Sequence, residues 1–306
     1  AAKIASGAVT TAKIADANVT AAKIASGVQL VTTDSQSNTV AGTSAGDSFS
    51  GTDAVHNTLY GKNAGTAITT GDYNIAVGSE SLAATTTGSQ NIGIGQDTFK
   101  TNTTGSYNVA IGGNALDAAT TASYNTAVGF ASLSSNTTGT RNVAVGKDAL
   151  NANTTANDNT ATGYNSLKNN TTGANNTAFG YSSLQDSTTG ENNTAVGYNA
   201  LVVNTTGSRN VSVGKQALDA NTTGSNNTAL GTGSLTGNTT ADDNTALGYY
   251  TLEANTTGAN NTAVGSRALD ANTTASNNTA VGRQALGANT TGTQNVAVGS
   301  AALDAN

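Results

Sequence analysis

Along most of the chain, the hydrophobic and polar positions follow one order that recurs with a 17-residue period. A representative unit is NTAVGYNALVVNTTGSR, which runs from residue 193 to residue 209. We number its positions from the first Asn, so that Gly197 stands at position 5 and Leu201 at position 9. Fifteen such units, the last one incomplete, fill residues 57–306 without an insertion. A short fixed period of this kind predicts a solenoid in which each unit forms one structural step.

The first four positions of the unit predict a short β-strand. A β-branched residue at position 2 and a large apolar residue at position 4, here Thr194 and Val196, share one face of a strand, and we expect that face to contribute to the interior. The glycine at position 5 then turns the chain, either with a positive φ or because a neighbour lies too close for a Cβ atom. Position 15 holds Gly207 in this unit but Ala in four others, which indicates a need for a small residue rather than for a left-handed backbone.

The rest of the unit predicts a second buried contact and a closing turn. Leu201 represents the large apolar residue at position 9, and the sequence from Asn204 through Thr205, Thr206 and Gly207 closes the loop. No segment is long enough for a stable helix. We therefore predict an all-β fold, a parallel β-solenoid or β-roll with one 17-residue coil per repeat. The Asn at position 1, represented by Asn193, is expected to form hydrogen bonds with its equivalents or with the turns of adjacent coils.

One such coil buries few large side chains for the length of chain that it orders. The small residues at positions 3 and 8, here Ala195 and Ala200, offer faces where neighbouring chains could approach closely. We therefore expect a homo-oligomer that forms an elongated fibre.

The remaining parts of the chain have other patterns. Residues 1–30 follow a ten-residue repeat and predict a slender shaft wound with partner chains, whereas residues 31–56 keep neither period and are predicted to be a junction. The sequence ends within a unit at Asn306, so we expect it to be part of a longer polypeptide.

Composition narrows the possible functions. Only 10% of the residues are charged and 4% are aromatic, too few large side chains for a thick core. The net charge of −6 is dispersed and no Lys/Arg cluster follows a phosphate backbone, so we expect no nucleic acid partner. The absence of Cys excludes disulfides and thiolate metal sites, and no apolar run approaches the roughly 18 residues typical of membrane insertion.

The shaft sequence AKIASGAVTTAKIADANVT, followed by tandem units such as NTAVGYNALVVNTTGSR, resembles tail fibres of tailed bacteriophages. The AVG core of the unit is also similar to the head repeats of trimeric autotransporter adhesins, whose units differ in length. These resemblances imply a homotrimer on a virion tail fibre or another extracellular appendage. They further imply contacts with other appendage proteins and with a host cell-surface glycan or protein.

Candidate chemistry is sparse. His56 is the only histidine and is interpreted as a junction residue, and the acidic residues at position 10, such as Asp117, alternate with Lys and Val, which argues against a calcium ladder. The Asn-Thr-Thr triplets match the acceptor pattern for N-glycosylation, but turn closure is the preferred interpretation. An ice-binding face is disfavoured because adjacent threonines on a strand point to opposite faces. We predict no enzymatic activity, no metal and no cofactor.

Two functions remain open. The first is a structural spacer of a phage tail fibre, a host-attachment appendage that positions a receptor-binding tip lying outside this segment. The second is a surface adhesin that binds glycan or protein along the rod. Tyr164, Tyr181 and Tyr198 stand at position 6 of three successive units and are candidate glycan contacts, but Lys215 and Thr232 end the run. That interruption favours the spacer.

Overall fold

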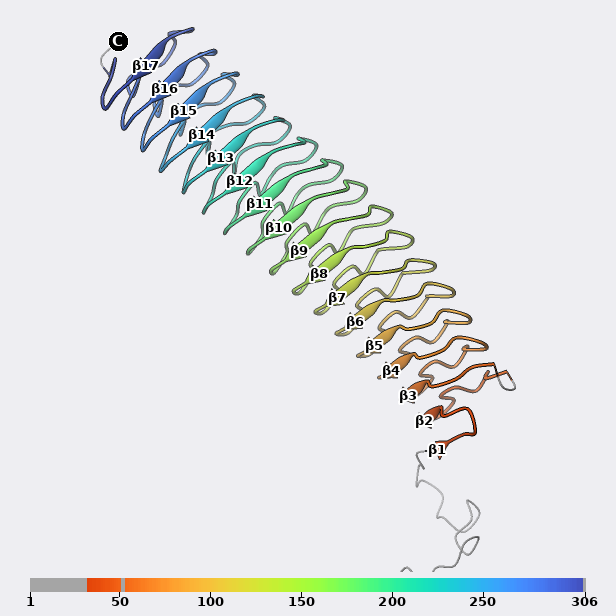
Figure 1. Cartoon of the computed structure of the whole chain (residues 1–306). Helices are drawn as coiled ribbons and strands as arrows, with labels where there is room; N and C mark the ends of the chain where they lie inside the picture. Colours follow the sequence, from red (N-terminus) through yellow and green to blue (C-terminus); the bar gives the residue numbers. More distant parts are fainter. Residues whose placement is uncertain (1–31, 51–52, 305–306) are drawn as a thin grey trace, which may run out of the picture.

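The protein forms a rod of stacked coils with one sheet along its side (Figure 1). The computed structural model describes residues 32–50 and 53–304. A short strand, β1 (Thr32–Thr33), pairs antiparallel with β2 (Thr39–Ala41), and from β2 onwards each strand pairs in parallel with the next. The other strands are β3 (Thr58–Tyr60), β4 (Ile75–Val77), β5 (Ile92–Ile94), β6 (Val109–Ile111), β7 (Thr126–Val128), β8 (Val143–Val145), β9 (Thr160–Thr162), β10 (Thr177–Phe179), β11 (Thr194–Val196), β12 (Val211–Val213), β13 (Thr228–Leu230), β14 (Thr245–Leu247), β15 (Thr262–Val264), β16 (Thr279–Val281) and β17 (Val296–Val298).

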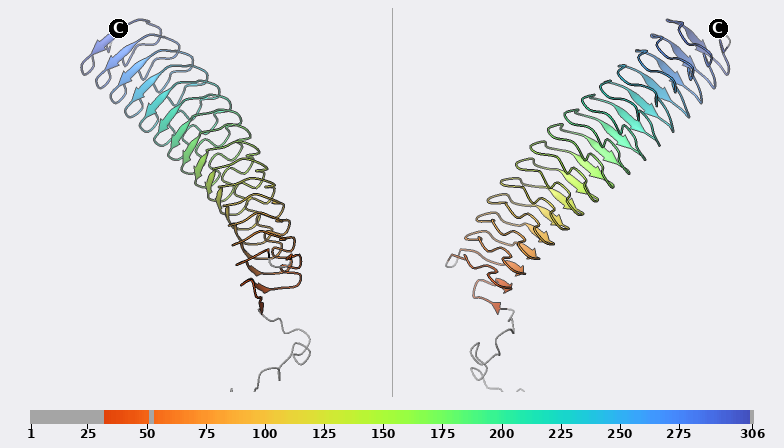
Figure 2. Two further views of the ribbon diagram at one scale, coloured as in Figure 1. Left: turned by 45° about the vertical axis from the view of Figure 1, so that its right-hand side comes forward. Right: turned by 180° about the vertical axis from the view of Figure 1, so that it is seen from behind.

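The register between coils equals the sequence period. Ala195 of β11 lies beside Ser212 of β12, its equivalent in the next unit. The side of the rod opposite the sheet consists of turns, and these are also bonded from coil to coil: the Leu201 N–H donates to the Ala217 carbonyl over 2.9 Å. Two further views show that the coils stack along one gently curved axis (Figure 2). The predicted all-β parallel solenoid with one 17-residue coil per repeat is confirmed, and the described residues contain no helix.

The interior of each coil holds smaller side chains than the sequence predicts. Leu201 is fully buried as expected, but it is joined by the small residues Ala195 and Ala200, which are also fully buried. Val196, by contrast, points outwards and is partly exposed. Two predictions are therefore wrong: position 4 does not face the interior, and positions 3 and 8 do not face neighbouring chains. The reason is space, because Leu201 and the buried asparagines at positions 1 and 12 fill much of the coil, so that positions 3 and 8 take small residues, chiefly Ala and Ser.

Gly197 shows why position 5 is always glycine. Its φ is +137°, and a Cβ atom there would lie 2.5 Å from the carbonyl oxygen of Gly214 in the next coil. Both reasons considered for this glycine, the positive φ and the close neighbour, therefore apply. Gly207 at position 15 is not left-handed, although a Cβ atom there would press against the Gly224 carbonyl oxygen. Four other units hold Ala at this position, so small shifts relieve that contact, and the position requires a small residue rather than a special backbone.

Leucine at position 9 adopts a conformation that leucine seldom takes. Leu201 has a φ of +53°, and each of the other described leucines at this position also has a positive φ. Such a backbone costs a bulky residue about 1–2 kcal/mol. The side chain is buried nonetheless, so the packing of the leucine column offsets this strain.

The solenoid begins before the predicted junction ends. Asn38 already occupies position 1 of a coil, because its Oδ1 accepts a hydrogen bond from the Asn57 N–H over 2.8 Å. Gly42 of this coil has the φ of +142° that is typical of position 5. Residues 38–50 and 53–56 thus belong to an additional coil, which corrects the interpretation of residues 31–56 as a junction alone. The predicted shaft, residues 1–30, lies outside the described residues.

Gly65, one of two exceptions to leucine at position 9 together with Phe99, has a local explanation. Leu59 and Ile68 of the same coil are buried, and a Cβ atom on Gly65 would approach their side chains within 2.7 and 2.8 Å. The bulk that Leu supplies in other coils is supplied here from positions 3 and 12.

Candidate interaction surface

Asn193 represents a continuous column of buried amides. Its backbone N–H donates to Asn176 Oδ1 over 2.9 Å, and its own Oδ1 accepts from the backbone N–H of Asn210 over 3.0 Å. Its Nδ2 group donates to the Gly207 carbonyl of the same coil over 2.9 Å. The expected asparagine ladder is confirmed, and it joins the strand both to the adjacent coils and to its own closing turn.

A second asparagine column, at position 12, was not predicted. Asn221 donates its Nδ2 hydrogens to Asn204 Oδ1 over 2.9 Å and to the Gly224 carbonyl over 3.0 Å. The Asn of each Asn-Thr-Thr triplet marks this column in the sequence, but the triplet pattern alone predicts only a closing turn. Asn102, Asn204 and Asn221 are fully buried, so their amide nitrogens are inaccessible to a glycosyl group in the folded rod.

This second column has a defect at Ser187. From Asn136 to Asn289, all the remaining residues at position 12 are Asn. The Oδ1 atom of Asn170 and the hydroxyl of Ser187 are both buried and have no hydrogen-bond partner. The serine is too short to reach the amide of the preceding coil.

The two threonines of the turn have different roles. Thr205 is half-buried and donates its hydroxyl to the Thr222 carbonyl over 3.0 Å. Thr206 is exposed, and only its backbone N–H bonds to the next coil, again to Thr222 over 3.3 Å. The pair therefore presents one exposed threonine per coil and no doubled row, as the argument against an ice-binding face expected.

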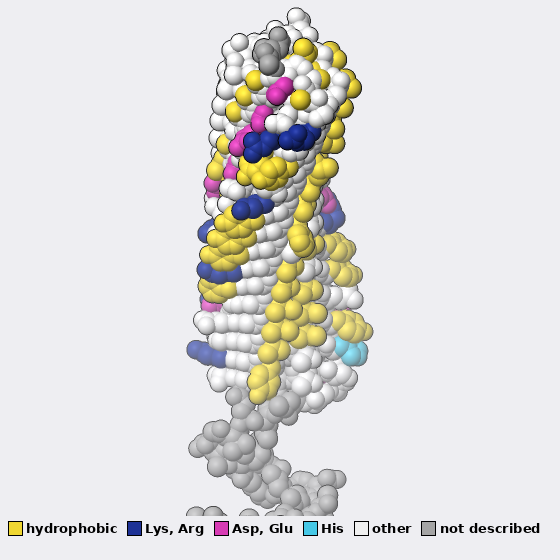
Figure 3. Space-filling view, turned by 90° about the vertical axis from the view of Figure 1, so that its left-hand side faces the viewer, with side chains coloured by type: hydrophobic (Ala, Val, Ile, Leu, Met, Phe, Trp, Pro, Cys, Tyr) yellow, Lys and Arg dark blue, Asp and Glu magenta, His cyan; other side chains and the backbone are white. Residues whose placement is uncertain are grey.

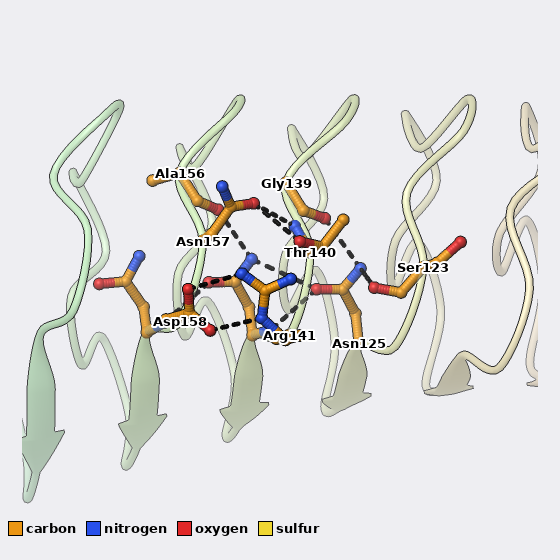
Figure 4. A network of polar contacts seen from close by, with 10 residues as sticks. Ser123, Asn125, Gly139, Thr140, Arg141, Ala156, Asn157 and Asp158 are labelled. Carbon is orange, nitrogen blue, oxygen red and sulfur yellow. Dashed lines mark hydrogen bonds and ion pairs between the residues drawn. The ribbon is translucent and has the colours of Figure 1, made fainter.

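Polar side chains also connect coils at the edge of the sheet (Figure 4). Asp158 accepts two hydrogen bonds from Arg141 of the preceding coil, from Nε over 2.7 Å and from a terminal guanidinium nitrogen over 2.8 Å. These hydrogen bonds hold the pKa of the Asp158 carboxyl below its usual value. Beside them, the backbone N–H of Thr140 donates to Asn157 Oδ1 over 2.7 Å. Because the charged pair is exposed, it contributes little to stability.

The outward face of the sheet carries an apolar stripe. Positions 2 and 4 point out of every coil, and none of the 15 units has a charged residue at either position. Leu230 is 46% exposed and Phe179 is 58% exposed. In the space-filling view, apolar side chains form a band along the rod on this face, with further apolar groups on both sides of it (Figure 3). Contiguous exposed apolar surface of this kind marks an interaction site.

Three tyrosines predicted as glycan contacts stand beside this stripe. Tyr164, Tyr181 and Tyr198 are each 42–49% exposed and stack in succession, with ring centroids 5.4 and 5.2 Å apart. Lys147 lies 5.5 Å from the centroid of the Tyr164 ring, a cation–π contact. The three rings cover much of one another's faces, which leaves chiefly their edges and hydroxyls for a ligand.

The other candidate groups lie apart from one another. His56 stacks on Tyr73 with ring centroids 4.8 Å apart. Burial raises the pKa of the carboxyls of Asp117 and Asp270, which occupy different parts of the rod. Within residues 32–50 and 53–304, no three His, Cys, Asp or Glu side chains gather to form a candidate metal site.

In the part of the chain that the structure describes, no helix has the length and apolar character needed to cross a membrane. The chain matches no protein-family model, no curated protein and no solved structure in the comparisons made with each.

Proposed function

We propose that this chain is a structural spacer: a rod in an extracellular appendage such as a phage tail fibre, where it holds a binding tip away from the particle. The observation that carries the proposal is the repetition of the same hydrogen bonds between successive coils. The N–H of Thr194 donates to the Asn210 carbonyl over 2.8 Å, and that of Thr228 to the Asn244 carbonyl, also over 2.8 Å. Each added unit lengthens such a rod by a fixed step without changing its cross-section.

The spacer acts in this proposal as part of a homo-oligomer, a homotrimer by resemblance to tail fibres and adhesin heads. Other appendage proteins would attach at its ends, and a host glycan or protein would be bound by the tip. The virion or appendage location rests on the same resemblance.

Adhesion along the rod is the second candidate, and the stacked Tyr164, Tyr181 and Tyr198 are the observation that favours it. Lys147 and Lys215 occupy position 6 on either side of these coils, and tyrosine returns at this position only once, at Tyr249. A binding surface that used the whole rod would repeat its contact residue in every coil. The spacer is therefore the better supported function.

Length measured against copy number tests the spacer. Deleting residues 193–243, which are three complete units, should shorten the rod by about 14 Å at ~4.8 Å per coil, with its width unchanged. Electron microscopy of the purified chain measures both dimensions. A rod that collapses or changes width after this deletion would contradict a length-setting role.

Adsorption to bacterial cells separates the two functions. The purified chain should not adsorb in a saturable way if it only positions a tip. Saturable adsorption that Tyr181→Ser abolishes and Thr206→Ser leaves intact would instead establish adhesion along the rod.

A further inference from the structure

We propose that the outward face of the sheet, formed by positions 2 and 4 of each unit, is the surface on which copies of this chain pack against one another, parallel and in register. This inference deepens the proposed function and rests on it, because it names the surface through which the fibre would assemble. It also replaces the predicted contact through positions 3 and 8, since Ala195 and Ala200 are fully buried inside the coil.

The first support is the chemistry of the face. At position 4, fourteen of fifteen units carry an aliphatic or aromatic residue, and at position 2 all carry Thr, Val or Ile. A strand face that stayed in water would carry polar and charged side chains instead. Residues of high β-propensity without charge on an open face favour packing against a second sheet.

The second support is the size of the face. Fifteen coils at ~4.8 Å extend over about 70 Å, and three strand residues give a width of about 10 Å, so the stripe covers roughly 700 Å². The largest apolar patch on a typical monomer is ~300–600 Å², whereas a stable interface needs about 800 Å² per partner. The tyrosines beside the stripe, such as Tyr181, add to the apolar area. Thr occupies ten of the thirty outward positions, so part of the face is polar, but its total area is close to what a stable interface requires.

A second copy of the chain is the occupant that fits the whole stripe. The apolar positions recur once per coil from Thr58 to Val298, in the parallel register of the strands. A partner must present side chains at the same spacing over the same length to bury them all. A second copy of the chain has the same side chains at the same spacing, so it meets this requirement.

Thr162 favours the parallel arrangement. It is the one residue at position 4 that is neither aliphatic nor aromatic. In a parallel, in-register pair related by a two-fold axis along the rod, position 4 of one copy faces position 2 of the other. Thr162 then lies across from Thr160 of the second copy, and the two hydroxyls can donate to and accept from each other. In a fully overlapped antiparallel pair, it lies across from Val196 and its hydroxyl has no such partner.

Chemical cross-linking tests both the surface and the direction, because the chain contains no native Cys. In the full chain carrying Val213→Cys, a short bis-maleimide that spans the ~10 Å between packed sheets should link copies covalently. The matched control is Thr223→Cys, an exposed position on the turn side of the same coil, which should not cross-link. An antiparallel assembly would hold the two introduced thiols about 19 Å apart along the axis, four coils at ~4.8 Å each, and would leave them unlinked.

A charge variant provides an independent measurement. Val213→Lys combined with Leu230→Lys should weaken self-association at least about tenfold, because burying lysine without a partner is costly. Thr223→Lys combined with Thr240→Lys adds the same charge on the exposed turn side and should leave association unchanged. Light scattering gives the mass of each variant, and circular dichroism checks that each variant is folded.

Three outcomes would overturn the inference: an oligomer that does not cross-link through Val213→Cys, equal association of the two lysine pairs, or a monomeric wild-type chain. A monomeric wild-type chain would not contradict the spacer function if the rod still shortens with each deleted unit. The two proposals can therefore fail separately.

Discussion

Replacing Ser187 with Asn should stabilise the rod, because it completes the second asparagine column. In the wild-type protein, Asn170 Oδ1 and the Ser187 hydroxyl are buried without a hydrogen-bond partner. Asn at this position would occupy the same place as Asn221 in its own coil. That residue donates to Asn204 over 2.9 Å and accepts from Asn238 over 2.9 Å.

The size of the effect follows from those bonds. The new amide should donate to Asn170 Oδ1 and accept from Asn204 Nδ2, and each bond contributes a net ~0.5–1.5 kcal/mol. Fixing the longer side chain costs up to about 1 kcal/mol. We expect a net gain of about 1–2 kcal/mol in the free energy of unfolding, centred on the coils on either side of residue 187.

Hydrogen exchange and urea unfolding together measure this gain. The backbone N–H of Thr188, which donates to the Thr205 carbonyl over 2.9 Å, should exchange more slowly in the Ser187→Asn variant. Ser208→Asn adds the same atoms on the surface of the rod and should change neither measurement. An unchanged or lower stability of Ser187→Asn would refute the assignment of the column as a stabilising ladder.

Further substitutions test the core, the turns and the carboxylates. Leu201→Asp buries an unpaired carboxylate and should cost more than about 4 kcal/mol, whereas Ser208→Asp should change stability by less than ~0.5 kcal/mol; equal thermal melts would show that position 9 does not face the interior. Gly197→Ala forces a Cβ atom onto a residue with φ +137° and should cost at least ~2 kcal/mol in urea unfolding, while Gly207→Ala should cost less, because Ala fills position 15 in four other units. Asp117→Asn should stabilise the rod at neutral pH. Burial raises the pKa of this carboxyl, so its destabilising charge disappears as the pH falls through that raised pKa, and the advantage of Asn should then vanish in unfolding experiments between neutral and acidic pH.

The period of the sequence determined much of the fold, because a constant spacing places the same hydrogen-bonding groups beside one another in successive coils. The glycine at position 5 and the leucine at position 9 could be assigned to a turn and to the interior from residue type alone, as Gly197 and Leu201 confirm. The sequence also predicts Asn193 as a ladder residue, because an amide side chain can both donate and accept hydrogen bonds between identical coils. These positions share a property that the sequence reveals: the same residue type recurs at each of them in almost every unit.

The orientation of the strand could not be predicted in the same way. Strand alternation places Thr194 and Val196 on one face and Ala195 on the other, but it does not say which face is inside. Hydrophobicity favours the face of Val196, and this led to the wrong choice. The deciding quantity is the space left after Leu201 and the asparagine columns enter the coil, and it depends on all sides of the coil at once.

The additional coil that begins at Asn38 could have been found. The stretch from Asn38 to Gly42 has Asn at position 1 and Gly at position 5, as in the later units. It was missed because its first Asn precedes Asn57 by a spacing of 19, whereas Asn57 precedes Asn74 by the regular 17. Ser50 and Ala54 take positions 13 and 15 through hydrogen bonds with Thr69 and Asn38, so the sequence has three residues between these positions where the later units have one.

This longer coil predicts where the rod tolerates insertions. Adding Gly-Ser after Thr206, at the equivalent corner, should cost less than about 1 kcal/mol, because lengthening a surface loop costs little closure entropy. The same dipeptide inserted between Ala195 and Val196 displaces the rest of β11 from the strands beside it and should disrupt at least that coil. Urea unfolding and hydrogen exchange of the flanking coils distinguish the two variants. If both insertions destabilise the rod equally, the whole coil is rigid and no corner tolerates added residues. If only the strand insertion destabilises the rod, the rigidity of the coil lies in the sheet and in the two asparagine columns, and the corner at position 14 is free to vary.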